Sequence, residues 1–344
     1  MALSRNLLTD CLARREFAYR ILEIGTGLTL VVTTAGGRVF GPFLGDTDAL
    51  GWSPDADTFE EVLLAGQWNI GGERIWLAPE RVFNFSDPAR MLDTYHVDPA
   101  VDPGTWSLTS ESAGIALEAS SIIPRTDGGE PISVKLSRRI TPLRASSGRE
   151  LPEDLVLAGY RQSIEVTCPQ FQGGIAIVPW LVRQVVLGGD AMLSASGSGR
   201  GERVFGKPPP DAITPRKGRW LVRLGPQGFF KTSYSRHVIG AGGLGYVITG
   251  KGQATALVLH PVLVAPDHYP ETLPHDTGSP GQAAALFCDD GQFGSYGELE
   301  LYGHKASKTH GTLGCDTLFL SGTVKAVSAA LASQATEMSS MPIS

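Results

Sequence analysis

The sequence predicts an all-β fold in which two large antiparallel sheets pack face to face. Two observations support this prediction: short apolar runs recur along the whole chain, and turn-forming residues are abundant. The 344 residues include 42 glycines and 23 prolines, together about a fifth of the chain, without the strict period of a collagen sequence. The spacing of apolar residues that is typical of helices is found near the two ends, at 3–17 and 324–337.

The apolar runs have the length and composition of strands. They are rich in Val, Ile, Leu and aromatic residues, and turns such as Gly25-Thr26-Gly27 separate them. In one run Ile132, Val134 and Leu136 alternate with polar residues, which predicts one buried and one solvated face. The expected strands are 17–24, 28–33, 38–44, 115–121, 132–141, 156–166, 175–186, 220–224, 245–248, 254–259, 284–287, 297–302 and 317–321.

We expect one domain that spans residues 1–344. The apolar fraction of 42% is enough for a sizeable core, and large β-sandwiches often exceed the usual domain length. Two segments, 191–219 and 266–281, are rich in Pro and polar residues and are expected to be long loops that cover a site or project from the fold.

Composition argues against several classes of partner. The net charge is −6 and no long Lys/Arg run occurs, so nucleic acid is not an expected partner. No apolar run approaches the ~20 residues that span a bilayer, so no membrane is expected either. The N-terminal stretch lacks the apolar core of a signal peptide, and the four scattered cysteines fit reduced thiols, which together favour the cytoplasm. The sequence does not set the number of subunits.

No cofactor is expected. The glycine-rich stretch 240–245 is followed by a strand pattern rather than a helix start, unlike a nucleotide-binding loop. A metal site assembled from His260, His275, Glu298 and Glu300 is conceivable, but no local ligand spacing supports it. We therefore expect no metal.

Three stretches, in a fixed order, carry a family resemblance. They are Leu28-Thr29-Leu30-Val31-Val32-Thr33-Thr34-Ala35-Gly36-Gly37-Arg38-Val39, then Gly71-Gly72-Glu73-Arg74-Ile75-Trp76-Leu77-Ala78-Pro79-Glu80, and finally Gly297-Glu298-Leu299-Glu300-Leu301. Together they resemble the aldose 1-epimerase, or galactose mutarotase-like, superfamily, and most closely its uncharacterised bacterial branches. The resemblance implies a large β-supersandwich that binds a small carbohydrate on a concave face.

One feature of that family is missing from the sequence. The family commonly carries an Asn-His pair in a middle strand, and this His acts as the general acid. The corresponding stretch is Val166-Thr167-Cys168-Pro169-Gln170-Phe171, which contains no His. Another acid must therefore replace it, or the reaction differs, or activity is lost.

Glu300 and Glu298 are candidate catalytic residues. They are two apart and share one strand face, and two carboxylates that close repel each other, so one pKa should rise toward neutrality. Such a group can accept or release a proton at an anomeric centre. The resemblance implies that Glu300 is the base. The alternative is an acidic strand edge that faces solvent.

Arg74, Trp76, Glu80 and Lys231 are candidate substrate-binding residues. Arg74 and Trp76 share a strand face, and a guanidinium beside an aromatic plane suits a sugar. The alternative is that Arg74 pairs with Glu80 or Glu73 while Trp76 fills the core. Lys231 follows two phenylalanines and could hold a carboxylate or phosphate on the sugar, or could lie over the aromatic rings with its charge in water.

Further candidates come from histidines and from the middle strand. The position of His96 along the chain resembles that of a substrate-binding His in the family, and we take it as the general acid. His260 ends a strand and is a second substrate-binding candidate. Trp180 and Arg183 could line the pocket in the strand where the usual His is missing.

These residues favour an enzyme that acts on a free sugar or sugar acid, most concretely a 1-epimerase. Two alternatives stay open. The same fold could serve a polysaccharide or oligosaccharide lyase or a glycoside hydrolase, or the chain could bind a sugar without transforming it.

Overall fold

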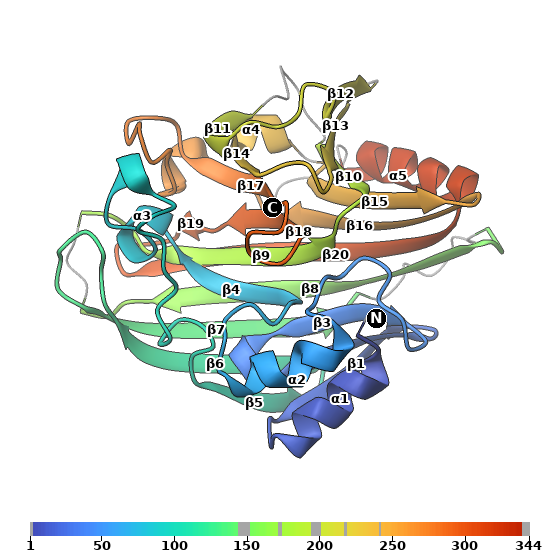
Figure 1. Cartoon of the computed structure of the whole chain (residues 1–344), viewed down its shortest axis with the longest axis horizontal. Coiled ribbons are helices and arrows are strands. Elements are labelled where there is room, and N and C mark those ends of the chain that lie inside the picture. Colours follow the sequence, from blue (N-terminus) through green and yellow to red (C-terminus); the bar gives the residue numbers. More distant parts are fainter. Residues whose placement is uncertain are drawn as a thin grey trace.

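The computed structural model describes residues 3–143, 152–170, 174–193, 201–216, 219–240 and 242–338. Within these residues the molecule consists of two large sheets with a few short helices (Figure 1), and every strand pairing in the two sheets is antiparallel. The predicted all-β fold class is confirmed.

The first sheet carries the candidate site. It has nine strands among the described residues, and its centre is formed by strands that are far apart in the sequence. In spatial order they are β1 (Tyr19–Gly25), β2 (Leu28–Thr33), β3 (Val39–Leu44), β4 (Glu73–Ala78), β9 (Val178–Val186), β18 (Tyr296–Tyr302), β17 (Gln282–Cys288), β14 (Phe230–Ser235) and β11 (Glu202–Gly206).

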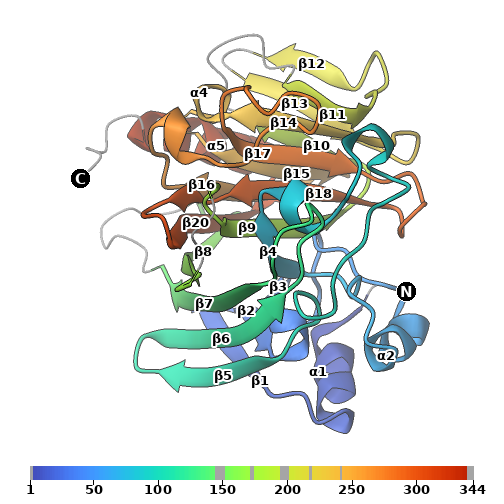
Figure 2. The same ribbon diagram turned by 90° about the vertical axis from the view of Figure 1, so that its left-hand side faces the viewer.

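The second sheet has eleven strands among the described residues and packs against one face of the first. In spatial order its strands are β12 (Ile213–Arg216), β13 (Arg219–Leu224), β10 (Gly189–Leu193), β15 (Leu244–Gly250), β16 (Gln253–Pro261), β20 (His310–Thr323), β8 (Leu155–Thr167), β7 (Ile132–Pro142), β6 (Gly114–Ile123) and β5 (Trp106–Glu111), with β19 (His304–Lys305) paired to β20. Strand β1 of the first sheet lies against β6, β7 and β8 of the second, as Figure 2 shows from the side.

The main core lies between the two sheets. One cluster of buried side chains joins them and includes Leu181 and Leu299 from the first sheet and Ile164 and Leu313 from the second. Removing this apolar surface from water is the principal force that holds the two sheets together.

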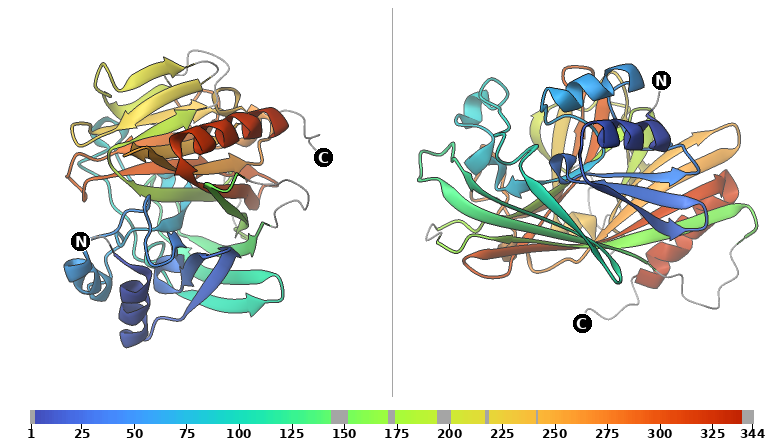
Figure 3. Two further views of the ribbon diagram at one scale, coloured as in Figure 1. Left: turned by 90° about the vertical axis from the view of Figure 1, so that its right-hand side faces the viewer. Right: turned by 90° about the horizontal axis from the view of Figure 1, so that it is seen from below.

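The helices cover outer surfaces. Helices α1 (Arg5–Arg14) and α2 (Ala56–Leu64) pack with β2 and β3 in a second apolar cluster. Helix α5 (Val324–Met338) packs with β16 and β20 in a third, on the outside of the second sheet (Figure 3). Two single-turn helices, α3 (Glu80–Phe83) and α4 (Arg236–Ile239), follow β4 and β14.

The Gly71-Gly72 turn places β4 in the first sheet. Both glycines have positive φ, at 88° and 72°. A Cβ on Gly71 would stand 2.4 Å from the Trp52 carbonyl oxygen, and one on Gly72 would stand 2.9 Å from the Phe40 ring. Only glycine fits these backbone angles and contacts easily, so this part of the motif has a structural reason.

The structure departs from the expected elements in two ways. The segment 191–219, expected as a loop, contains β11, β12 and the end of β10 among its described residues. Strands β5 and β14 and helix α2 were not expected either. Both expected terminal helices are present: α1 is shorter than the predicted range 3–17, and α5 contains the whole of the predicted range 324–337.

No helix in the described parts of the chain is long and apolar enough to cross a bilayer.

Candidate functional site

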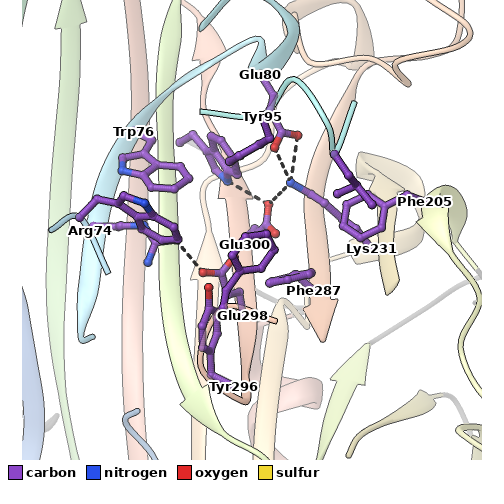
Figure 4. A pocket seen from close by; sticks show the side chains of 14 residues that line it. Arg74, Trp76, Glu80, Tyr95, Phe205, Lys231, Phe287, Tyr296, Glu298 and Glu300 are labelled. Carbon is purple, nitrogen blue, oxygen red and sulfur yellow. Dashed lines mark hydrogen bonds and ion pairs between the residues drawn. The ribbon is translucent and has the colours of Figure 1, made fainter. Parts of the chain in front are cut away.

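One hollow on the open face of the first sheet gathers most of the candidate residues (Figure 4). It contains about 440 Å³ of space between protein atoms, including its open mouth. The residues that line it are Trp68, Arg74, Trp76, Glu80, Leu92, Tyr95, Trp180, Phe205, Lys231, Phe287, Phe293, Tyr296, Glu298 and Glu300.

Strand register explains how distant parts of the chain meet here. Arg74 on β4 and Glu300 on β18 both pair with Val182 on β9, from its two sides. Trp180, two residues earlier on β9, pairs with Trp76 on one side and with Tyr302 on the other. Directly paired residues in a sheet point to the same face, so these side chains converge on one surface.

Glu300 is fully buried and has two unlike oxygens. Its Oε2 atom accepts hydrogen bonds from the Trp180 indole nitrogen at 3.0 Å and the Tyr302 hydroxyl at 3.0 Å, and it lies 3.0 Å from the Lys231 Nζ atom. Its Oε1 atom is buried without a hydrogen-bond partner in the described part of the chain. One oxygen is thus fixed, while the other can accept a proton.

Lys231 connects Glu300 to a second carboxylate. Its Nζ atom donates to both oxygens of Glu80, at 3.2 and 3.0 Å, and lies 4.5 Å from the centre of the Trp180 ring. Glu80 in turn uses its backbone N–H to donate to Glu271 Oε2 at 2.7 Å. Glu80, Glu271 and Glu300 are all buried; two of these carboxyl groups contact the ammonium, and the third holds the main chain of Glu80.

Arg74 and Glu298 form the other close pair of ionisable side chains. The Arg74 NH2 atom donates to Glu298 Oε1 at 2.6 Å, and Gln184 Nε2 donates to the same oxygen at 3.2 Å. The guanidinium carbon lies 4.1 Å from the Trp76 ring centre and 5.2 Å from that of Trp68, which is cation–π geometry. Arg74 Nε and NH1 are buried and have no hydrogen-bond partner among the described residues.

A buried aspartate supports this side of the hollow from beneath. Asp102 Oδ2 accepts from the Trp76 indole nitrogen at 2.8 Å and from Arg38 NH2 at 2.8 Å. Because the indole ring is held at its nitrogen and stacked against Arg74, its orientation in the hollow is fixed.

Burial raises the pKa values of Glu271, Glu298 and Glu300. Burial is the main cause of the raised pKa of Glu298 and of Glu300; Arg74 opposes it at Glu298, and Lys231 opposes it at Glu300. Burial and the nearby Glu80 charge raise the pKa of Glu271 to about 8. Burial alone would lower the pKa of Lys231, but Glu300 and Glu80 outweigh it and raise this pKa.

Seven of the predicted site residues lie in this hollow, and three do not. Arg74, Trp76, Glu80, Trp180, Lys231, Glu298 and Glu300 line it together. His96 is exposed and does not line it; its main chain is held by Asn84. The expectation that His96 lies at the site as its acid is wrong, because order along the chain does not fix where a loop residue points.

His260 and Arg183 are also elsewhere. His260 lies on β16 in the second sheet, opposite Asp316 of β20. Arg183 lies on β9, but strand side chains alternate, so it points away from the Trp180 face; it is fully buried and lies 3.6 Å from Asp48. Neither residue lines the hollow.

The structural alternatives for the charged residues are also wrong. Arg74 pairs with Glu298, whereas Glu73 points to the other face of β4 and pairs with Arg138. Glu298 and Glu300 are buried rather than a solvent-facing edge. Lys231 does not extend into water; it is buried between two carboxylates.

Several residues that line the hollow, or that contact its lining residues, were not predicted from the sequence. Tyr296 and Tyr302 continue the alternation of Glu298 and Glu300 on β18, so the period of two could have identified them. Glu271 and Phe293 lie in loops and Trp68 precedes β4, where no periodic pattern indicates direction.

The described residues contain no group of three or more His, Cys, Asp and Glu side chains that could hold a metal ion. Their four cysteines are buried and free.

Comparison with known proteins concerns the fold alone. No family model matches the sequence, and no curated protein matches it. Three similar solved structures each match 89% of this chain. A galactose mutarotase-like protein from Lactobacillus casei has 11% identity, 99% of its own chain covered and a TM-score of 0.46, and a galactose mutarotase related enzyme from Lactobacillus acidophilus has 8% identity, 99% covered and a TM-score of 0.47. A galactose 1-epimerase from Lactobacillus acidophilus has 12% identity, 95% of its chain covered and a TM-score of 0.46. The chain is thus structurally similar to galactose mutarotase-like proteins over about 89% of its length, at low sequence identity.

Proposed function

We propose that this chain is a sugar-active enzyme that interconverts the anomers of a free sugar or sugar acid. The observation that carries the proposal is the carboxylate pair on β18. Glu298 and Glu300 face one hollow, both are buried, and donors hold one oxygen of each. Two carboxyl groups in one pocket, with raised pKa values, supply the base and the acid that opening of a sugar ring requires.

Glu300 is the base in this proposal and Glu298 is the acid. Oε2 of Glu300 is contacted by the donor groups of Lys231, Trp180 and Tyr302. Oε1 of Glu298 accepts hydrogen bonds from Arg74 and Gln184. Hydrogen-bond donors stabilise the ionised form of a carboxyl group, and Glu300 has three against two for Glu298, so we assign the negative charge to Glu300 and the proton to Glu298.

The proposed reaction conserves protons. Glu300 Oε1 removes the proton from the anomeric hydroxyl, Glu298 gives its proton to the ring oxygen, and the bond between C1 and the ring oxygen breaks to give an open aldehyde. After rotation about the C1–C2 bond, the ring oxygen attacks the other face of the aldehyde. It returns its proton to Glu298, while Glu300 returns a proton to the anomeric oxygen.

The remaining residues of the hollow bind the sugar. The two unpartnered nitrogens of Arg74 suit a pair of hydroxyls or a carboxylate. The Trp76 and Trp180 rings, with centroids 5.2 Å apart, offer apolar surface for the C–H face of a pyranose. Lys231 was expected to bind the substrate. We now assign it a different role, which is to keep Glu300 ionised.

The first experiment replaces Glu300 by Gln. This substitution preserves the shape and the hydrogen-bond acceptor but removes the base, so we expect the interconversion rate to fall by at least about a hundredfold while sugar binding persists. Exchange NMR measures the rate, and titration measures binding. Glu118→Gln, an exposed position on β6, is the matched control. Wild-type interconversion in Glu300→Gln would refute the assignment.

One observation also favours a glycoside hydrolase or lyase. Two carboxyl groups in one pocket are what glycosidases use, and Glu80 is a third, held by Lys231. Incubation with oligosaccharides separates the possibilities, because new reducing ends or unsaturated sugars appear only if a glycosidic bond is cleaved. Saturable sugar binding with no chemical change would instead indicate a binding protein.

A further inference from the structure

Four phenylalanines form a continuous apolar surface beside the charged hollow. We call Phe205, Phe229, Phe287 and Phe293 the phenylalanine wall. Ring centroids lie 5.3 Å apart for Phe205 and Phe229, 5.9 Å for Phe229 and Phe287, and 6.2 Å for Phe229 and Phe293. These distances are within the range of direct aromatic contact, so the four rings behave as one surface.

The phenylalanine wall forms part of the lining of the hollow. Phe205, Phe287 and Phe293 line the hollow themselves. Figure 4 shows Phe205 beside Lys231, with Arg74 and Trp76 on the opposite side. A molecule in the hollow would therefore meet the carboxylates held by Lys231 and, beside them, a hydrocarbon surface.

The exposed tip of the wall is held in place. The loop that carries Phe293 is tied by the buried carboxylate of Asp289, which accepts from the backbone N–H groups of Gln292, Phe293 and Ser295 at 2.9 Å each. Asn69 Nδ2 also donates to the Phe293 carbonyl at 2.7 Å. The backbone of this loop is thus held by hydrogen bonds to a buried carboxylate, although 41% of Phe293 is exposed.

This surface suits an apolar group rather than a second sugar ring. Phenylalanine offers no hydrogen-bond donor or acceptor, and sugar hydroxyls need such partners when they leave water. Leu92, which is 43% exposed and also lines the hollow, adds hydrocarbon at the mouth. Exposed apolar surface that continues into a pocket is typical of a ligand-binding site.

We propose that the hollow has a second subsite, formed by the phenylalanine wall, that binds an aromatic or alkyl substituent carried by the sugar. The sugar part of this ligand rests on the function proposed above. The substrate is then a sugar with a free anomeric hydroxyl and an apolar group at another position.

Matched ligands test this subsite. The probes are glucose and galactose, and their 3-O-, 4-O- and 6-O-benzyl ethers, titrated by saturation-transfer NMR. We expect at least one ether to bind about tenfold more tightly than its parent sugar, because its ring leaves water against the wall. In Phe293→Ala the ratio of the two dissociation constants should fall toward one. Ile122→Ala, which removes an exposed apolar side chain on β6, should leave the ratio unchanged.

The outcomes separate the subsite from the proposed reaction. Ethers that bind no more tightly than their parents would overturn the subsite, and so would a gain that Phe293→Ala does not reduce. Absence of binding by every probe would overturn it as well. Tight ether binding without any interconversion of anomers would overturn the reaction but leave the subsite standing.

Discussion

Lys231 lies where the charges of the hollow meet. Its ammonium is within 3.0 Å of both Glu80 and Glu300, and all three side chains are buried. Such a buried cluster is stable only while the charges balance, because a lone ion in a low-dielectric site is costly. Lys231 also lowers the pKa of Glu300 against the raising effect of burial, so it sets the protonation state of the proposed base.

Replacing Lys231 by Met tests this role at the level of one residue. Without the ammonium the pKa of Glu300 should rise further, so the acidic limb of the pH–rate profile should move to higher pH. The free energy of unfolding should fall by about 3–5 kcal/mol, the usual cost of breaking a buried ion pair. Steady-state rates across pH measure the first effect and chemical denaturation the second.

The control for that variant is Lys305→Met, an exposed lysine on β19. A purely structural role for Lys231 predicts lower stability with an unmoved pH profile, and that result would contradict our assignment.

At the level of elements, the sequence pattern identified strands whose apolar residues stand out. Strands β6, β7 and β20 alternate buried and more exposed residues along much of their length, and runs within them were predicted. Strand β14 was not predicted because its sequence is mostly polar, with Lys231 and Ser233 on the face toward the site. Nearly all of the strand is nevertheless buried. A strand that lines a polar pocket loses the apolar signal on which prediction depends.

The loop between β17 and β18 gives a prediction at this scale. Asp289→Ala would remove the acceptor of three backbone N–H groups on exposed residues, and the net loss is about 1 kcal/mol for each hydrogen bond because water can replace the carboxylate. We expect a lower melting temperature and, because Phe293 loses its fixed position, a smaller advantage of benzyl ethers over their parent sugars. The adjacent exposed Asp290 provides the control Asp290→Ala. Equal stability of the two variants would contradict this account of the loop.

At the scale of the whole molecule, the site depends on sheet order rather than on any local motif. Arg74, Trp76 and Glu300 were expected in one hollow, and β9 brings them there by pairing with both β4 and β18. Periodicity assigns residues to a face, but it does not say which strands become neighbours. For the same reason His260 was assigned to the site although its strand belongs to the second sheet.

The two sheets also bury titratable groups whose effects on stability oppose each other across pH. Burial lowers the pKa of His260 from its ordinary value of 6.5 to about 4, and this outweighs the attraction of Asp316. Between these two values the unfolded chain binds a proton that the folded chain excludes. The free energy of unfolding therefore falls as pH decreases through this window, by at most about 3 kcal/mol.

Glu271 affects the free energy of unfolding at higher pH. Its pKa rises from 4.5 to about 8 in the fold, so between these values the folded chain holds a proton that the unfolded chain releases. Its contribution to stability is complete below about pH 4.5 and is lost as pH rises through about 8. Together with His260, this group predicts a stability maximum at mildly acidic pH, between about 4.5 and 6.5, where the two opposite effects cancel. Calorimetric melting temperatures across pH should show that maximum. His260→Leu should remove the acid limb and let the alkaline fall begin near pH 4.5, whereas Glu271→Gln should remove the alkaline limb and let the acid rise continue to about pH 6.5. If either variant keeps both limbs, the group it removes does not control stability, because no proton is then exchanged on unfolding at that position.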